Sequence, residues 1–298
     1  MARYGLAAKK SWGQNFLVDR GVQARIVAAA ALSSDDVALE IGAGLGALTG
    51  HLLAQAGRVI AVERDPDMVR VLRGEFANEE RLEIRAMDAL EIDFAAEAGP
   101  LVVIGNLPYQ ITTPLLFAIL EGARRGETIA RAVLMVQREF AERVVAGAGS
   151  KIYGRLSVMV QQQAAVEILF HVPAGAFHPR PAVTSTVFRL VPRARPLHPV
   201  ADDALFAAVV RASFATRRKM LRRALAPVRD EALFAAVVRP AFATRRKMLR
   251  RALQPAFGEA AAPALERAEI AGTRRAEELD VAAFARLADA LFAEGARA

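Results

Sequence analysis

The sequence predicts an α/β fold in which a parallel sheet is covered by helices on both faces, followed by a smaller helical domain. Short runs rich in β-branched residues alternate with helical patterns through the first two thirds of the 298 residues, as is typical of successive βαβ units. After residue 196 no such run occurs, and the chain becomes rich in Ala, Leu and Arg. With 54% hydrophobic residues, the chain can bury a full core.

Five β-rich runs give the predicted strands. A parallel sheet is buried on both faces, so its strands are nearly continuous apolar runs. We expect a helix after each of the five, which lie at 37–41 (VALEI), 58–62 (RVIAV), 82–86 (LEIRA), 101–105 (LVVIG) and 132–136 (AVLMV). Pro192, Pro196 and Pro199 mark a boundary beyond them. We therefore expect a first domain at 1–195 and a helical, basic domain at 196–298.

The second domain contains a tandem duplication. Residues 202–229 recur at 230–257, and 22 of the 28 positions are identical. A solenoid needs about three or more units, so a single repetition disfavours one. In each copy we expect an apolar helix, a break at Phe-Ala-Thr, and a basic helix with Thr216 or Thr244 as its N-cap.

The positive charge is concentrated in this duplication. The chain carries a net charge of +8, and residues 202–257 hold 13 basic against 4 acidic residues. Such a segment favours a polyanionic partner, although a solvated helix face is the alternative. The candidate RNA-binding residues are Arg217, Arg218, Lys219, Arg222 and Arg223 in copy one, and Arg245, Arg246 and Lys247 in copy two.

The composition argues against several classes of protein. Cysteine is absent, and the four histidines show no ligand-like spacing, so we expect neither a disulfide scaffold nor a metal site. No run of about 18 uncharged apolar residues occurs, and no apolar segment follows the basic N-terminus. We therefore expect a cytoplasmic protein without a membrane partner.

A glycine-rich turn follows the first strand in "LEIGAGLGALT" (39–49). Gly42, Gly44 and Gly46 permit positive φ angles and let the backbone approach a ligand closely. The motif also satisfies a looser dinucleotide fingerprint, and a plain strand-to-helix turn would look the same. On its own it indicates a ligand only weakly.

Two carboxylates end the next two strands. Glu63 lies 21 residues after Gly42, where an acidic side chain can accept hydrogen bonds from both hydroxyls of a ribose. Asp88 follows the third strand, where a carboxylate can face an adenine amino group. An isolated Asp in "MDALEI" is more often a helix cap.

The fourth strand ends in Asn106, Leu107, Pro108 and Tyr109, which distinguishes between the possible ligands. The Asn106 side chain and a main-chain carbonyl near Pro108 supply two acceptors, because Pro108 has no N–H. Two acceptors match the two hydrogens of an exocyclic adenine amine and favour a nucleophilic nitrogen facing a sulfonium methyl. Tyr109 offers a flat face on which an extruded base can stack.

With these motifs the chain resembles the ribosomal RNA adenine dimethyltransferases along nearly its whole length. The matching segments include "KKSWGQNFLVD" (9–19), "NLPYQITTPLLF" (106–117), "MVQREFAERVVA" (135–146), "FHPRPAVTSTVFRL" (177–190), "FATRRKMLRRAL" and "RRAEELDVAAFARLADAL" (274–291), together with the glycine turn and the two carboxylates.

The resemblance implies a Rossmann-like methyltransferase domain that uses S-adenosylmethionine. It implies that Asn15 and Leu17 lie near the cofactor, with Gly42 at its methionine end, Glu63 on the ribose, Asp88 on the adenine and Asn106 beside the transferred methyl. Phe177 would be a second stacking face opposite Tyr109, with a core phenylalanine as the alternative. The implied reaction is N6,N6-dimethylation of two adjacent adenosines near the 3′ end of 16S rRNA, by a monomer acting on the small ribosomal subunit precursor.

Three other functions remain open. A large-subunit rRNA adenine methyltransferase of the antibiotic-resistance type would share the catalytic motifs, although "RRAEEL" favours the small-subunit enzyme. A non-catalytic RNA-binding or transcription factor derived from the family would be expected to lose Asn-Leu-Pro-Tyr. A dehydrogenase would bind NAD instead. The duplication departs from the family, whose members usually have one "F-x-x-RRK-x-L" unit.

Overall fold

The computed structural model describes residue 4 and residues 14–97, 99–108, 110–126, 128–225 and 248–296, with only the backbone given for 215–225. The chain divides into two compact units, Met1–Val145 with Gln163–Ala194, and Ala146–Gln162 with Arg195–Ala298. The predicted domain boundary at residue 195 stays a prediction.

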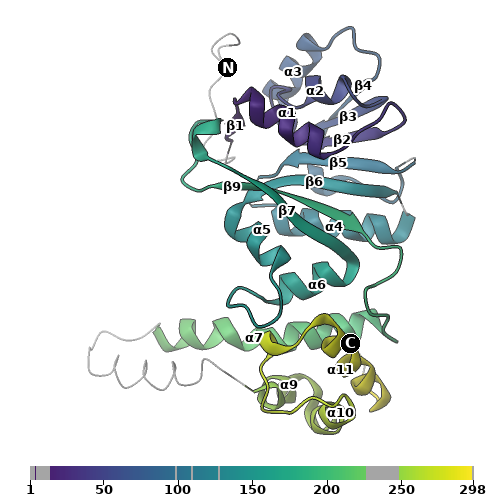
Figure 1. Cartoon of the computed structure of the whole chain (residues 1–298), viewed down its shortest axis with the longest axis vertical. Helices are drawn as coiled ribbons and strands as arrows, with labels where there is room; N and C mark the ends of the chain where they lie inside the picture. The colour runs from purple at the N-terminus through teal and green to yellow at the C-terminus, as the bar shows by residue number, and fades with distance from the viewer. Residues whose placement is uncertain are drawn as a thin grey trace. The chain divides into compact units, whose positions relative to one another are not determined.

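The first unit is built on a seven-stranded sheet in the order β4-β3-β2-β5-β6-β9-β7 (Figure 1). The five predicted strands are confirmed and run parallel to one another. They are β2 (Val37–Ile41), β3 (Arg58–Glu63), β4 (Leu82–Ala86), β5 (Leu101–Asn106) and β6 (Ile129–Gln137). All five therefore end at the same edge of the sheet, where open α/β sheets bind ligands.

Two strands that we did not predict complete the sheet. The strand β9 (Ser185–Pro192) lies antiparallel to both β6 and β7 (Ala164–Val172). A separate two-stranded pair joins β1 (Phe16–Leu17) to β8 (Phe177–His178), with η4 (Ala174–Ala176) before β8. This pair ties the N-terminal segment to the region after β7.

Helices cover both faces of the sheet (Figure 1). One face is covered by α1 (Arg20–Ala29), α2 (Thr49–Leu53) and α3 (Pro66–Glu75), and the other by α4 (Thr112–Gly126) and α5 (Arg138–Val145). Ile26 and Leu52 are fully buried against strand residues such as Val102. The two covered faces agree with the predicted architecture.

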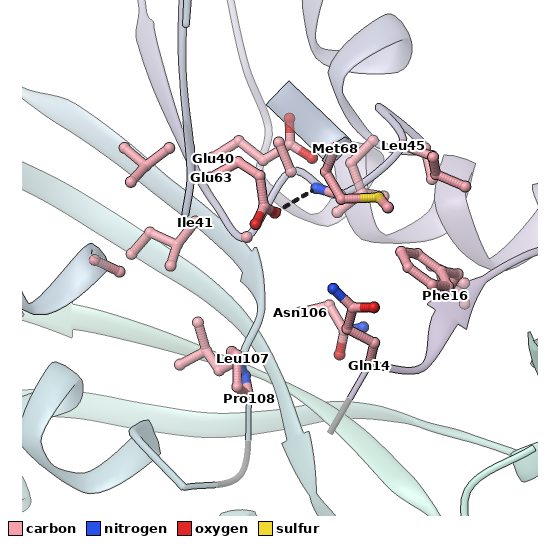
Figure 2. Close-up of a pocket in the computed structure, with 18 of the residues that line it drawn as sticks. Gln14, Phe16, Glu40, Ile41, Leu45, Glu63, Met68, Asn106, Leu107 and Pro108 are labelled. Carbon is pink, nitrogen blue, oxygen red and sulfur yellow. Dashed lines mark hydrogen bonds between the residues drawn. The ribbon is translucent and has the colours of Figure 1, made fainter. Parts of the chain in front are cut away.

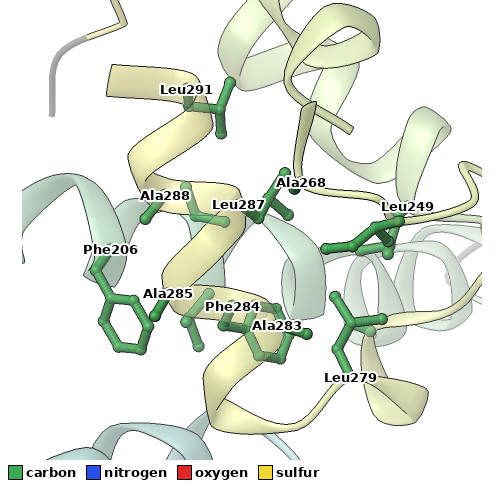
Figure 3. Close-up of a cluster of buried hydrophobic side chains, with 14 of the residues drawn as sticks. Phe206, Leu249, Ala268, Leu279, Ala283, Phe284, Ala285, Leu287, Ala288 and Leu291 are labelled. Carbon is green, nitrogen blue, oxygen red and sulfur yellow. The ribbon is translucent and has the colours of Figure 1, made fainter. Parts of the chain in front are cut away.

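The second unit is helical. Its elements are α6 (Arg155–Gln163), α7 (Asp203–Leu225), α9 (Leu249–Phe257), η5 (Gly258–Ala260), α10 (Ala261–Arg267), η6 (Ala276–Glu278) and α11 (Val281–Ala293). Helix α7 packs against α9 and α11, and Figure 3 shows Phe284 and Leu287 of α11 within the buried cluster.

Among the described residues, the core of this unit contains the first half of copy one and the second half of copy two of the duplication. Leu205, Phe206 and Val209 of α7 belong to copy one, whereas Leu249 and Leu253 of α9 belong to copy two, and all five are buried in one cluster. Figure 3 shows Phe206 and Leu249 in this cluster. Residues 226–247, which join these halves, lie outside the described part of the chain.

Two predictions of local structure were wrong. The segment after β4 forms a single 3-10 turn, η3 (Ala89–Glu91), rather than an α-helix, because Asp88 caps a turn that ends in extended backbone at Ile92. The predicted break at Phe-Ala-Thr is absent in copy one, since α7 continues through Thr216 to Leu225. No Gly or Pro interrupts this stretch, and its Ala, Leu and Arg residues favour a helix. The equivalent Thr244 lies outside the described residues.

No helix in the described part of the chain is long and apolar enough to cross a membrane.

Candidate active site

A pocket opens at the carboxyl ends of β2, β3, β4 and β5, and residues of the first unit alone line it. Figure 2 shows Glu63, Asn106 and Gln14 around it. Six residues predicted from the motifs line this pocket, namely Gly42, Gly44, Glu63, Asp88, Asn106 and Phe177, and so do Asn15, Leu17, Leu107 and Pro108.

The glycine turn uses the backbone freedom that the sequence predicts. Gly42, Gly44 and Gly46 have φ angles of +73°, +57° and +81°, a region that side chains with a Cβ disfavour. Gly42 and Gly44 line the pocket, whereas Gly46 faces α3. A Cβ on Gly46 would lie 2.6 Å from Cε2 of Phe76, so a larger residue here would have to displace the Phe76 ring.

Glu63 is held in place by two backbone donors. The Gly44 N–H donates to its Oε2 at 2.8 Å, shown as a dashed line in Figure 2, and the Asp65 N–H donates to its Oε1 at 2.8 Å. A carboxylate has about four acceptor positions, so both oxygens can still accept from a ligand. The turn and the end of β3 therefore fix this carboxylate at the pocket wall.

Asp88 caps a turn and also lies in the wall of the pocket. Its Oδ1 accepts from the Leu90 N–H at 3.0 Å and caps η3. Its Oδ2 accepts from Nη1 of Arg64 at 3.2 Å. Because Asp88 also lines the pocket, the helix cap and the ligand-facing position are compatible.

The side-chain amide of Asn106 is oriented by the N-terminal segment. Its Nδ2 donates to the carbonyl of Asn15 at 3.3 Å. No described residue donates to its Oδ1, which is thus an acceptor at the half-buried end of β5. Asn15 is held in turn by its neighbours, since Nε2 of Gln14 donates to Oδ2 of Asp65 at 2.8 Å and Leu17 pairs with Phe177.

The next carbonyls differ in what they bind. Pro108 O accepts from the Ile111 N–H and from Oγ1 of Thr112, each at 3.1 Å, so it belongs to the start of α4. The Leu107 N–H donates to Met135 O at 3.0 Å, while no described residue donates to the Leu107 carbonyl. Leu107 O is therefore the main-chain acceptor beside Asn106. Tyr109 lies outside the described residues.

Phe177 is only 5% exposed and belongs to the buried cluster with α1. It also lines the pocket. Its burial in the core is thus compatible with a place in the pocket wall, and stacking on a base stays a prediction.

Sequence reasoning missed Glu40, which lines the pocket and is 2% exposed. Oγ1 of Thr49 donates to its Oε2 at 2.5 Å. Burial raises the pKa of the Glu40 carboxyl to about 8, the Thr49 hydrogen bond opposes this increase, and the nearby Glu63 adds to it. An acidic residue inside the apolar run "VALEI" was the available signal.

The predicted RNA-binding residues cannot be located at side-chain level. Arg217, Arg218, Lys219, Arg222 and Arg223 lie on the part of α7 for which only the backbone is described, and Arg245, Arg246 and Lys247 lie outside the described residues. Within the described residues, no cluster of three or more acidic or histidine side chains could hold a metal ion.

Comparison with known proteins identifies close relatives. The family model "Ribosomal RNA adenine dimethylase" matches residues 5–228. "Ribosomal RNA small subunit methyltransferase A" of Anaeromyxobacter sp. (strain K) is 48% identical over 234 residues, 74% of this chain and 80% of that protein. Its namesake in Pseudomonas fluorescens is 39% identical over 292 residues, 97% and 96% of the two chains.

Two solved structures are also similar to this chain. A dimethyladenosine transferase from Plasmodium falciparum is 28% identical with a TM-score of 0.70, covering 91% of this chain and 95% of its own. The 23S rRNA methyltransferase ErmE is 26% identical with a TM-score of 0.61, covering 93% of this chain and 100% of its own.

Proposed function

The chain belongs to the ribosomal RNA adenine dimethylase family, and on that premise we propose that it dimethylates the N6 amines of two adjacent adenosines near the 3′ end of 16S rRNA. The methyl donor is S-adenosylmethionine. The enzyme acts in the cytoplasm as a monomer on the small ribosomal subunit precursor.

The charge of the pocket supports a cationic cofactor. Glu63 and Asp88 line it, and the one basic residue among its lining residues, Arg64, pairs with Asp88, which leaves the charge of Glu63 unpaired by a basic lining residue. A pyrophosphate would face these carboxyl groups without a free cation, which argues against NAD and a dehydrogenase. A sulfonium cofactor with an ammonium group suits the same surroundings.

Each proposed cofactor contact uses either a side chain that can accept a further hydrogen bond or a backbone segment that can approach the cofactor closely. Glu63 would accept from the ribose hydroxyls and Asp88 would accept from the adenine amine. Gly42 and Gly44 would let the turn approach the methionine end, where a Cβ would stand in the way. Asn15 and Leu17 would cover the cofactor from the N-terminal segment.

The observation that carries the proposal is the pair of acceptors at the end of β5. Asn106 and Leu107 are consecutive and both line the pocket, and none of the described residues donates to Asn106 Oδ1 or to Leu107 O. The adenine amine has two N–H groups, so two acceptors satisfy both. Because Nδ2 of Asn106 is engaged by Asn15 O, the side chain presents its oxygen.

These acceptors promote the reaction by acting on the amine nitrogen. When bound, S-adenosylmethionine supplies an electrophilic methyl group on a positively charged sulfur. Accepting both hydrogens withdraws the nitrogen lone pair from the ring, and the two oxygens stabilise the positive charge that develops on nitrogen. Pro108 fixes the turn, and Tyr109 and Phe177 would stack against the extruded base. The proton on nitrogen is lost to solvent after transfer.

The choice of RNA follows the relatives. The small-subunit methyltransferases are 39% to 48% identical to this chain, whereas the 23S enzyme is 26% identical. The intact Asn106 and Leu107 argue for an active enzyme over a non-catalytic binding protein. We assign rRNA binding to the basic residues of the duplication, Arg217, Arg218, Lys219, Arg222, Arg223, Arg245, Arg246 and Lys247.

The test is methyl transfer from labelled S-adenosylmethionine to unmethylated small subunits, with mass mapping of the modified bases. We expect two dimethyladenosines near the 3′ end of 16S rRNA. Asn106→Ala should lower transfer by about 10²-fold or more while cofactor affinity, measured by calorimetry, changes little. Equal activity of Asn106→Ala and the unaltered enzyme would refute the role assigned to Asn106. Labelling of 23S rRNA alone would show that 23S rRNA, and not 16S rRNA, is the substrate.

A further inference from the structure

The wall of the pocket contains a carboxyl group that the proposed reaction does not use. Glu40 is the fourth residue of β2, and its register partners Ala61 and Ile104 are uncharged. Its side chain is 2% exposed, and Thr49 on α2 is its only hydrogen-bond donor among the described residues. One neutral donor does not compensate a buried carboxylate, so the neutral acid is favoured.

The charges that face Glu40 also favour its neutral, protonated form. On β3 the nearest charged group is Glu63, whose carboxylate repels a second negative charge. On α2 the facing residue is the neutral Thr49, and Arg64 at the end of β3 is paired with Asp88. Burial, with this repulsion, raises the pKa of Glu40 to about 8. Near neutral pH, the group therefore holds its proton when the pocket contains no cation.

We propose that uptake of a cationic cofactor into this pocket displaces the proton of Glu40, so that binding and proton release are coupled. The inference rests on the proposed function, because S-adenosylmethionine brings a sulfonium and an ammonium group. A positive charge in the pocket stabilises the carboxylate. The O–H bond of Glu40 breaks, its electron pair stays on the carboxylate, and the proton passes to the buffer. Thr49 keeps donating to the carboxylate.

This coupling gives Glu40 a positioning role with a measurable signature. The cofactor reaches full affinity only after the proton has left, so the contribution of Glu40 to the affinity should rise about tenfold per pH unit below pH 8 and level off above it. The cofactor's own amine, whose pKa is about 7.7 by analogy with an α-amino group, also titrates in this range. Comparing the unaltered chain with Glu40→Gln, both binding the same cofactor, removes the contribution of the cofactor amine.

The experiment is titration calorimetry of the full chain with S-adenosylmethionine between pH 6 and 9, in phosphate, HEPES and Tris buffers. The dependence of the heat on buffer ionisation enthalpy gives the protons released. Between the unaltered chain and Glu40→Gln at pH 7, we expect a difference near one proton per cofactor, and it should vanish at pH 9. Thr49→Val, which removes the donor, should shift the rise in affinity to higher pH and keep the release.

The outcomes separate the inference from the proposed function. If S-adenosylmethionine binds but Glu40→Gln and the unaltered chain release equal numbers of protons, Glu40 is not the coupled group and the inference fails. A Thr49→Val variant without any shift in the pH profile would also contradict it. If Glu40→Gln does not fold, the Thr49→Val profile decides alone. Absence of cofactor binding at every pH would overturn the proposed function and the inference together.

Discussion

Deleting residues 216–243 should give a folded and active protein. The core of the second unit uses Leu205, Phe206 and Val209 from copy one and Leu249 and Leu253 from copy two, and the deletion keeps all of them. It removes 28 residues, so one complete unit remains, made of 202–215 and 244–257. The pocket residues all precede residue 178, so cofactor binding should be unchanged.

The expected change in the free energy of unfolding follows from the length of the chain that joins Phe214 of copy one to Leu249 of copy two. In the full chain 34 residues join Phe214 to Leu249, and in the shortened chain 6 residues join them. Six extended residues span up to about 20 Å. For a connection without fixed structure, shortening from 34 to 6 residues would lower the closure entropy cost by about 1.5 kcal/mol. Because the first part of this connection belongs to α7, which continues to Leu225, that value is an upper bound, and we expect the free energy of unfolding to change by less than about 2 kcal/mol.

Denaturant unfolding followed by circular dichroism measures this change, and hydrogen exchange reports on α9 directly. The positive control is Leu253→Ala, which empties a fully buried position and should cost about 2–5 kcal/mol. The matched control is Leu225→Ala in the full chain, the same position in copy one, which should cost below about 0.5 kcal/mol because Leu253 fills the core. An unfolded deletion protein, or a larger loss for Leu225→Ala than for Leu253→Ala, would refute the reasoning.

Three further predictions concern the pocket and the RNA. Gly46→Ala should destabilise the protein by about 1–3 kcal/mol in thermal or urea unfolding, because of the positive φ at this position and the contact with Phe76. The control is Gly74→Ala in α3, where no atom lies within 4 Å of the added Cβ. This substitution should stabilise the protein by about 0.5–1 kcal/mol. Glu63→Ala should weaken S-adenosylmethionine binding by roughly 1.5–3 kcal/mol, and unchanged affinity in calorimetry would place the ribose elsewhere. RNA affinity should fall steeply with salt concentration. Charge reversal at Arg217, Arg218, Arg222 and Arg223 should flatten this salt dependence. An unchanged salt dependence would identify the basic segment as a solvated helix face.

The sequence predicts the pocket well because parallel strands bring their carboxyl ends to one edge. Gly42, Glu63, Asp88 and Asn106 are far apart in the chain, yet each follows or ends a strand and each lines the same pocket. Their contacts with a ligand stay predictions. What the sequence could not give is the state of Glu40, since only the packed fold removes its carboxyl group from water.

Local patterns were less reliable where two structures satisfy the same residues. Asp88 is a suitable cap for an α-helix or for one 3-10 turn, and the chain beyond Ile92 decides for the turn. Phe-Ala-Thr contains no residue that ends a helix, so α7 continues through it. The expected break came from reading Thr216 or Thr244 as the N-cap of a second helix, whereas helix propensity favoured one helix.

The few differences between the copies agree with the halves that form the core. In the first half, copy one has Ala212 and Ser213 where copy two has Pro240 and Ala241. Position 212 lies inside α7, where a proline would remove a backbone hydrogen bond and cost about 3 kcal/mol, while Oγ of Ser213 donates to Val209 O at 2.7 Å.

In the second half of the repeat, the sequence of copy two suits the core better than that of copy one. Phe257 ends α9 and packs against the buried cluster, whereas copy one has Arg229 at this position, and a guanidinium cannot replace an apolar ring there without a partner. Copy two also continues directly into η5 at Gly258, so α9 needs no added loop before α10. A proline that disfavours copy two in the first helix and an arginine that disfavours copy one in the last are thus enough to select one combination from two nearly identical sequences.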